Sequence, residues 1–183
     1  MYPWERVIAS QDSTLRIIHE AVKRDHEVSI THPSNLTIRE SITLSLCKQI
    51  LLGEKLTRSI TSFYKTVKFD VKMCPLSEFD VIFMRDNPPL NGLVLNFLDS
   101  IKDDVFIINA IDGLREANNK IYTAAYFDAD RELIPATHVS KNIDYLLRII
   151  EESENDKMIM KPLDGYGGSG VIIIEKSAMK NIR

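Results

Sequence analysis

Cysteine is scarce in this sequence of 183 residues, which contains only Cys47 and Cys74. The two cysteines do not form a Cys-x-x-Cys pair, and neither has a histidine at the spacing of metal ligands. A disulfide framework and a zinc site are therefore disfavoured, we expect no metal site, and two scattered thiols are typical of a reducing compartment. The histidines are isolated from one another along the chain: His19, His26, His32 and His138.

Long apolar runs and an excess of one charge are also absent. No run approaches the roughly 20 apolar residues that a membrane-spanning helix needs, and the N-terminus lacks the hydrophobic core of a signal peptide. The formal net charge is −3, with both signs interspersed and no basic stripe. We therefore expect a soluble cytoplasmic protein whose main partner is neither a nucleic acid nor a membrane.

Alternating helix and strand patterns predict an α/β fold. Asp12, Ser13 and Thr14 resemble a helix N-cap, and apolar residues follow at helical spacing as far as Lys23. Between residues 36 and 69 the apolar residues partly alternate, which predicts two or three antiparallel strands with a turn at Gly53 and Glu54. Further strands are predicted over residues 27–30, 79–84, 105–109 and 135–139, and further helices over residues 91–100, 114–122 and 141–150, the last with Ser140 as its cap.

A glycine loop at residues 165–170 follows Lys161 in the stretch KMIMKPLDGYGGSGVIIIEK, residues 157–176. Apolar residues on both sides, too few for helices, predict strand, loop and strand. A dinucleotide fingerprint or a P-loop requires a helix after the glycines, and a protein kinase places its lysine after them. The remaining alternatives are a flap whose backbone N–H groups approach phosphate oxygens beside Lys161, or a glycine-rich surface hairpin with a solvated lysine.

Four blocks of the sequence together resemble prokaryotic glutathione synthetase, a family of ATP-grasp ligases. The last block is the most specific, because KPLDGxGG with an upstream Asn-x-Lys between two strands is hard to reach by chance. The blocks are DST at residues 12–14, DVIFMR at 80–85 with prolines at 88 and 89, IN at 108–109 with LR at 114–115 and NNK at 118–120, and KPLDGYGG at 161–168.

The resemblance implies a two-part organisation. Residues 1–116 would form a substrate-side domain with an open βα sheet, and residues 117–183 would form the first, nucleotide-binding ATP-grasp subdomain, with the C-terminal portion of the ATP-grasp fold missing. In that family ATP phosphorylates the carboxylate of γ-glutamylcysteine, and the amine of glycine then displaces phosphate from the acyl phosphate. Such a reaction depends on positioning and charge neutralisation rather than on a protein nucleophile.

The resemblance also assigns candidate site residues. Lys120 and Lys161 match the lysines that hold the ATP phosphates, and Arg85 matches a substrate-side position where a guanidinium can pair with a carboxylate. The alternatives are a solvated helix lysine for Lys120 and a structural salt bridge for Arg85. Residues of the nucleotide-covering loop are Gly165, Gly167, Gly168, Ser169 and Gly170, of which Ser169 and Gly170 depart from the commoner family sequence.

Departures from the family pattern keep other functions open. Asn87 and Asn91 stand where the family usually has acidic residues, so a related ligase with another peptide substrate is one alternative. The family's magnesium ligands belong to its C-terminal third, so Mg²⁺ is expected as a cofactor but this chain alone is expected to be catalytically incompetent. A non-catalytic remnant that binds nucleotide or a partner subunit is the other alternative, and we expect a homo-oligomer.

Overall fold

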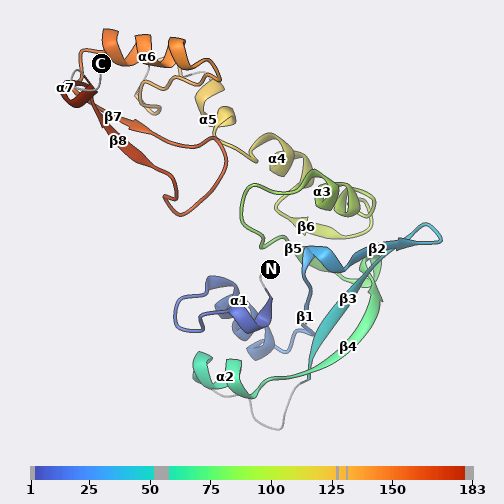
Figure 1. Ribbon diagram of the computed structural model, residues 1–183. Helices are drawn as coiled ribbons and strands as arrows, with labels where there is room; N and C mark the ends of the chain where they lie inside the picture. Colours follow the sequence, from blue (N-terminus) through green and yellow to red (C-terminus); the bar gives the residue numbers. More distant parts are fainter. Residues whose placement is uncertain (1–2, 52–57, 127, 131, 180–183) are drawn as a thin grey trace. The chain divides into compact units, whose positions relative to one another are not determined.

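The computed structural model describes residues 3–51, 58–126, 128–130 and 132–179, and the chain divides into two compact units. The N-terminal unit comprises Met1–Asp86 and Leu90–Ile111, and the C-terminal unit comprises Asn87–Pro89 and Asp112–Arg183. Helices and strands succeed one another along both units (Figure 1), which confirms the predicted α/β class. None of the helices in the described ranges is long and apolar enough to cross a membrane.

The first helix, α1 (Ser13–Lys23), begins where the sequence predicted. The Asp12 side chain accepts a hydrogen bond of 2.7 Å from the backbone N–H of Leu15 and so satisfies one free donor of the first turn. The apolar stripe of α1 packs beside α2 (Ile60–Thr66) and the short helix η1 (Trp4–Arg6). This hydrophobic core contains Val7, Leu15, Ile18, Val22, Ile30, Ile50 and Phe63.

An antiparallel sheet accounts for much of the N-terminal unit. Its long central strand β3 pairs with β4 along one edge and with β1 and then β2 along the other. The predicted antiparallel strands are therefore confirmed, whereas Gly53 and Glu54 lie outside the described residues. The bounds are β1 (Ser29–Ile30), η2 (Pro33–Asn35), β2 (Leu36–Arg39), β3 (Ile42–Leu51) and β4 (Lys68–Pro75).

Helix α2 was not predicted, because the apolar residues around it were read as strand. Ser59 caps this helix by accepting a hydrogen bond of 3.4 Å from the backbone N–H of Ser62. The helix buries Phe63, whose ring packs at a tilt against the ring of His19 in α1, with 4.9 Å between the ring centroids. Tertiary packing against α1 thus outweighs the strand pattern of the local sequence.

A parallel βαβ arrangement follows the antiparallel sheet. Strand β5 (Val81–Phe83) pairs in parallel with β6 (Phe106–Ile108), and α3 (Gly92–Asp99) lies between them in the sequence after η3 (Leu76–Glu78). Asn91 caps α3 by accepting a hydrogen bond of 2.8 Å from Leu93. Leu95, Leu98 and Ile107 are buried, as expected for a parallel pair that needs a covering helix.

The C-terminal unit is built around a β-hairpin. Strand β7 (Lys157–Met160) pairs antiparallel with β8 (Ile172–Glu175), so the predicted sequence of strand, glycine loop and strand is confirmed. No described residue in the range 112–178 is buried, in contrast to the N-terminal unit. The helices near this hairpin in the chain are α4 (Ile111–Glu116), α5 (Ile121–Ala125), α6 (Ile143–Glu152) and α7 (Lys176–Met179).

Three local predictions in this half are wrong. The helix predicted over residues 114–122 is two helices, since the Asn119 side chain accepts a hydrogen bond of 2.9 Å from Ile121 and starts α5 anew. Residues 135–139 are not a strand: Pro135 has no N–H to donate, and its carbonyl accepts from the Thr137 hydroxyl instead. The cap of α6 is Asn142 rather than Ser140.

Candidate functional site

The glycine loop takes a backbone conformation that other residues rarely adopt. The φ angles of Gly165, Gly167, Gly168 and Gly170 are +107°, +64°, +78° and +71°. A Cβ added to Gly170 would lie 2.7 Å from Cγ of Pro162, too close for any side chain. Two backbone hydrogen bonds, Ser169 to Tyr166 and Val171 to Gly168, fold the loop at 3.3 and 3.2 Å. The positive φ angles thus favour glycine at all four positions, and at Gly170 the lack of space requires it as well.

Lys120 contacts the stretch that leads into the glycine loop. Its Nζ donates hydrogen bonds of 3.2 Å to the carbonyl oxygens of both Leu163 and Gly165, and its backbone N–H donates to Leu163 as well. The side chain is half-buried and stands immediately before α5. The structure therefore brings together two of the predicted positions, and Lys120 is not a freely solvated helix lysine.

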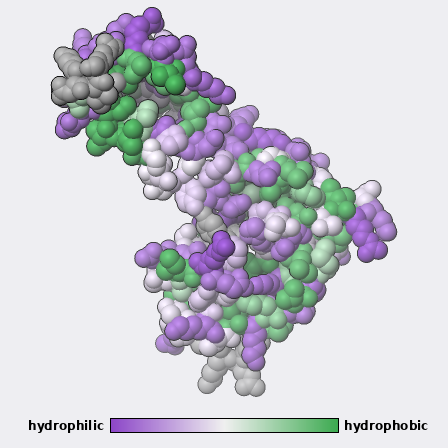
Figure 2. Space-filling model, in the orientation of Figure 1, coloured by the Kyte–Doolittle hydropathy of each residue, from purple (hydrophilic) through white to green (hydrophobic). Residues whose placement is uncertain are grey.

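Lys161 follows directly after β7 and is exposed. Side chains alternate along a strand, and extending that alternation by one residue places Lys161 on the same face as Ile159. Ile159 lies opposite Ile173 in β8, and the two side chains, here called the outer strip, are 63% and 68% exposed. Figure 2 shows hydrophobic side chains at the surface of this unit. The outer strip is thus an exposed apolar surface, and the alternation places the Lys161 cation on the same face.

Arg85 stands just beyond β5 in the N-terminal unit. Its guanidinium donates hydrogen bonds to Ser13 Oγ at 3.0 Å and to Thr14 Oγ1 at 3.3 Å, at the first turn of α1. Among the described residues no carboxylate pairs with it, so the predicted structural salt bridge is not observed there. Neutral hydroxyls orient the guanidinium without neutralising it, which leaves the exposed cation able to pair with a carboxylate.

The two groups of candidate residues belong to different units. Arg85 is part of the N-terminal unit, whereas Lys120, Lys161 and the glycine loop are part of the C-terminal unit. Within the C-terminal unit, the donors suit phosphate oxygens: two ammonium groups beside a loop of backbone N–H groups. Among the described residues, no group of three or more His, Cys, Asp or Glu side chains could hold a metal ion.

The cysteines offer no reactive thiol. Cys47 and Cys74 are free and buried, at 2% and 7% exposure, on neighbouring strands of the antiparallel sheet. Burial, together with the neighbouring Cys74, raises the pKa of the Cys47 thiol to about 12. A thiol with such a pKa is almost entirely protonated at neutral pH and does not act as a nucleophile.

Two family models match the chain, the prokaryotic glutathione synthetase N-terminal domain over residues 1–115 and the prokaryotic glutathione synthetase ATP-grasp domain over residues 119–183. The chain belongs to the prokaryotic glutathione synthetase family. The resemblance inferred from the four sequence blocks is therefore confirmed. One model ends and the other begins on either side of the segment that contains Asn118.

Curated glutathione synthetases are similar along nearly the whole chain. The protein from Buchnera aphidicola subsp. Acyrthosiphon pisum is 31% identical over 177 residues, which cover 94% of this chain and 52% of the relative. Those from Gloeobacter violaceus and Vibrio cholerae are each 27% identical, and each alignment covers 96% of this chain and 53% of the relative. The chain thus spans about half the length of the curated glutathione synthetases that it matches.

Some contacts of this glutathione synthetase family chain were missed at the sequence level. The sequence indicates Ser13 and Thr14 as helix-capping residues and as part of a family block, but it does not indicate that they accept hydrogen bonds from Arg85. The outer strip was not singled out, although the alternation in MIM and III around the glycine loop indicates it. The carbonyl of Leu163 as a partner of Lys120 has no sequence signal, because any residue type supplies a carbonyl.

Proposed function

We propose that the chain is part of an ATP-dependent carboxylate–amine ligase that joins γ-glutamylcysteine and glycine through an acyl phosphate. The observation that carries the proposal is the direct contact of Lys120 with the residues entering the glycine loop, in a chain that belongs to the glutathione synthetase family. Residues 1–116 form the substrate side and residues 117–183 the nucleotide side. We expect a cytoplasmic homo-oligomer.

On the nucleotide side, the two lysines and the glycine loop have different roles in binding the phosphates. Lys161 and Lys120 neutralise phosphate oxygens, and the backbone N–H groups of Gly165, Gly167, Gly168 and Gly170 approach them without hindrance from Cβ atoms. The backbone N–H of Ser169 donates to the Tyr166 carbonyl and helps to hold the loop in shape. The outer strip lies against the adenine ring, because flat apolar rings favour contact with exposed Ile159 and Ile173. ATP supplies the phosphoryl group that activates the peptide carboxylate.

On the substrate side, Arg85 binds a carboxylate of the peptide. Ser13 and Thr14 fix the direction of its guanidinium, so that little further ordering is needed on binding. The side chain of Asn91 caps α3, a role that an acidic residue such as aspartate could fill equally well. Asn87 remains the position at which a different peptide is most readily accommodated.

The second candidate function is nucleotide binding without turnover. It is favoured by one observation, namely that Lys120 contacts Leu163 and Gly165 within the C-terminal unit, without any residue of the N-terminal unit. In this case we expect the chain to bind ATP without binding the dipeptide and without turning ATP over.

Saturation-transfer NMR with ATP, γ-glutamylcysteine and glycine separates these functions. A ligase predicts that Lys161→Ala removes the ATP signal and spares the dipeptide signal, while Arg85→Ala does the reverse. Lys141→Ala, which changes another exposed lysine of the C-terminal unit, should leave both signals intact. An ATP signal without any dipeptide signal would support nucleotide binding alone, and absence of both from the folded chain would contradict the ligase proposal.

A further inference from the structure

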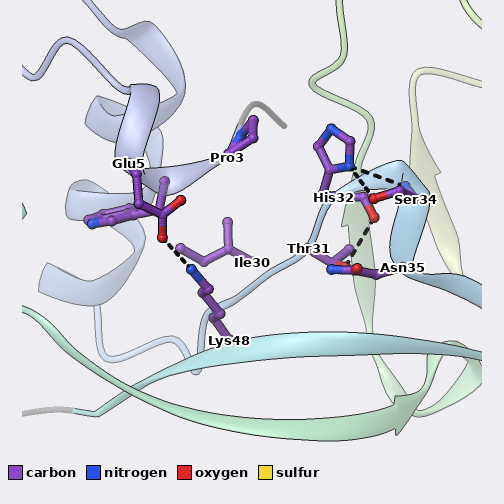
Figure 3. A pocket seen from close by; sticks show the side chains of 9 residues that line it. Pro3, Glu5, Ile30, Thr31, His32, Ser34, Asn35 and Lys48 are labelled. Carbon is purple, nitrogen blue, oxygen red and sulfur yellow. Dashed lines mark hydrogen bonds and ion pairs between the residues drawn. The ribbon is translucent and has the colours of Figure 1, made fainter.

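A pocket of about 310 Å³ lies in the N-terminal unit, where η1, the end of β1, η2 and β3 meet (Figure 3). None of the residues that line it is assigned a role in the proposed ligase. Its size lies at the lower end of the range for small-molecule sites. The lining residues are Pro3, Trp4, Glu5, Ile30, Thr31, His32, Ser34, Asn35 and Lys48.

One part of the pocket wall is apolar and rigid. Trp4 and Ile30 form this part of the wall, and the indole of Trp4 packs against the rings of Tyr64 and Phe69 at centroid distances of 5.0 and 5.1 Å. The Tyr64 hydroxyl also donates a hydrogen bond of 2.9 Å to the Trp4 carbonyl. An apolar side chain placed here is removed from water without any rearrangement of the wall.

A second part of the wall is polar but already bonded internally. Thr31 Oγ1 and Asn35 Nδ2 both donate to the Leu46 carbonyl, at 2.9 and 3.3 Å. His32 Nδ1 lies 2.7 Å from Ser34 Oγ and accepts a hydrogen bond of 3.2 Å from the Ser34 backbone N–H. These bonds fix the shape of the pocket opposite the ion pair in Figure 3.

The ion pair of Glu5 and Lys48 retains bonding capacity toward a ligand. Lys48 Nζ lies 2.7 Å from Glu5 Oε1, and the two side chains are 39% and 67% exposed. An ammonium has three N–H donors and a carboxylate has two oxygens, so each group has bonds to spare after the pair forms. The hydrogen bond from Lys48 lowers the pKa of Glu5, which keeps the carboxylate ionised at neutral pH.

We propose that this pocket binds an α-amino acid, with its ammonium at Glu5, its carboxylate at Lys48 and an apolar side chain against Trp4 and Ile30. An isolated anion would meet the negative charge of Glu5, and an isolated amine would meet the positive charge of Lys48. A zwitterion satisfies both charges at once, and the adjoining apolar wall selects for its side chain. This site is independent of the proposed ligase residues.

Trp4 makes the proposal directly measurable, because it is the only tryptophan of the sequence. Titration with L-leucine should change the tryptophan emission to saturation. Isocaproate, which lacks the ammonium, and isoamylamine, which lacks the carboxylate, should each bind at least about tenfold more weakly, since each loses one charge-assisted hydrogen bond. Equal affinity for leucine and either analogue would contradict the proposal that the pocket recognises both charges of a zwitterion. The absence of any response to leucine would contradict the proposal that the pocket binds an amino acid.

Variants locate the binding in the pocket. Lys48→Met and Glu5→Gln should each weaken leucine binding at least about tenfold, whereas Lys48→Arg should keep most of it because the charge remains. Lys23→Met, which removes a lysine paired with Glu20 on α1, is the matched control and should bind as the wild type does. Circular dichroism checks that each variant is folded. Wild-type affinity in a folded Lys48→Met variant would overturn the proposal.

Discussion

Lys120 connects two segments that lie more than 40 residues apart, and its bonds make it a positioning residue for the glycine loop. We expect Lys120→Ala to speed hydrogen exchange of amides at residues 163–170 about tenfold, because two charge-assisted hydrogen bonds are lost. Mass spectrometry of the nucleotide-free chain measures this change. Lys120→Arg should recover part of the protection and Lys141→Ala should change nothing; unaltered exchange in Lys120→Ala would show that these bonds do not order the loop.

Ionisation of Cys47 should lower the free energy of unfolding at alkaline pH. Burial raises the pKa of its thiol in the folded chain to about 12, above the ordinary value of a thiol, so the unfolded chain loses its thiol proton first as the pH rises. The free energy of unfolding should therefore fall between about pH 9 and 12, by up to roughly 1.4 kcal/mol per pH unit from this group. Urea unfolding of the wild type and of Cys47→Ala tests it: the variant should show a shallower decline, and identical slopes would contradict the assignment.

At the scale of elements, the outer strip predicts how the hairpin recognises a nucleotide. We expect Ile173→Ser to weaken ATP binding about tenfold while leaving tripolyphosphate binding unchanged, since only ATP carries a ring to lie on Ile159 and Ile173. Calorimetric titration of both ligands makes the comparison. Val71→Ser, which alters an exposed strand residue in the N-terminal unit, is the control. Equal losses for the two ligands would place the adenine ring elsewhere.

Helices and strands that were indicated by two independent sequence patterns were predicted correctly. Helix α1 has both a capping residue at Asp12 and an apolar period, and the hairpin has strand formers on both sides of a glycine loop. Where only one sequence pattern was present, tertiary packing determined the secondary structure. Helix α2, for example, forms because Phe63 is buried beside α1. Residues 135–139 are not a strand because Pro135 cannot donate to a ladder.

The candidate site also has parts that the sequence predicts and parts that it does not. The proposed roles of Lys161 and Arg85 could be inferred from the family blocks, because each side chain carries a charge suited to its proposed ligand. Their surroundings could not, since the partners are a carbonyl at Leu163 and the hydroxyls of Ser13 and Thr14, which have no distinctive spacing in the sequence. The side-chain roles remain predictions.

For the whole molecule, burial is distributed unevenly between the two units. The N-terminal unit contains the core around Leu15 and Phe63, whereas the described residues in the range 112–178 include no buried one. We therefore expect slow hydrogen exchange in α1 and β3 and fast exchange throughout α6 and the hairpin, because protection follows buried apolar contacts. Comparable protection of both units would contradict this expectation and would show that the C-terminal unit has stabilising contacts of its own.

The proposed nucleotide role of the C-terminal unit is tested most directly by isothermal titration of the 183-residue chain with ATP, with and without Mg²⁺. The account predicts measurable binding in both conditions, and a loss of at least about tenfold in Lys161→Ala but not in Lys141→Ala, because only Lys161 is proposed to face the phosphates. Absence of binding by the folded chain, or equal affinity of Lys161→Ala and the wild type, would contradict it.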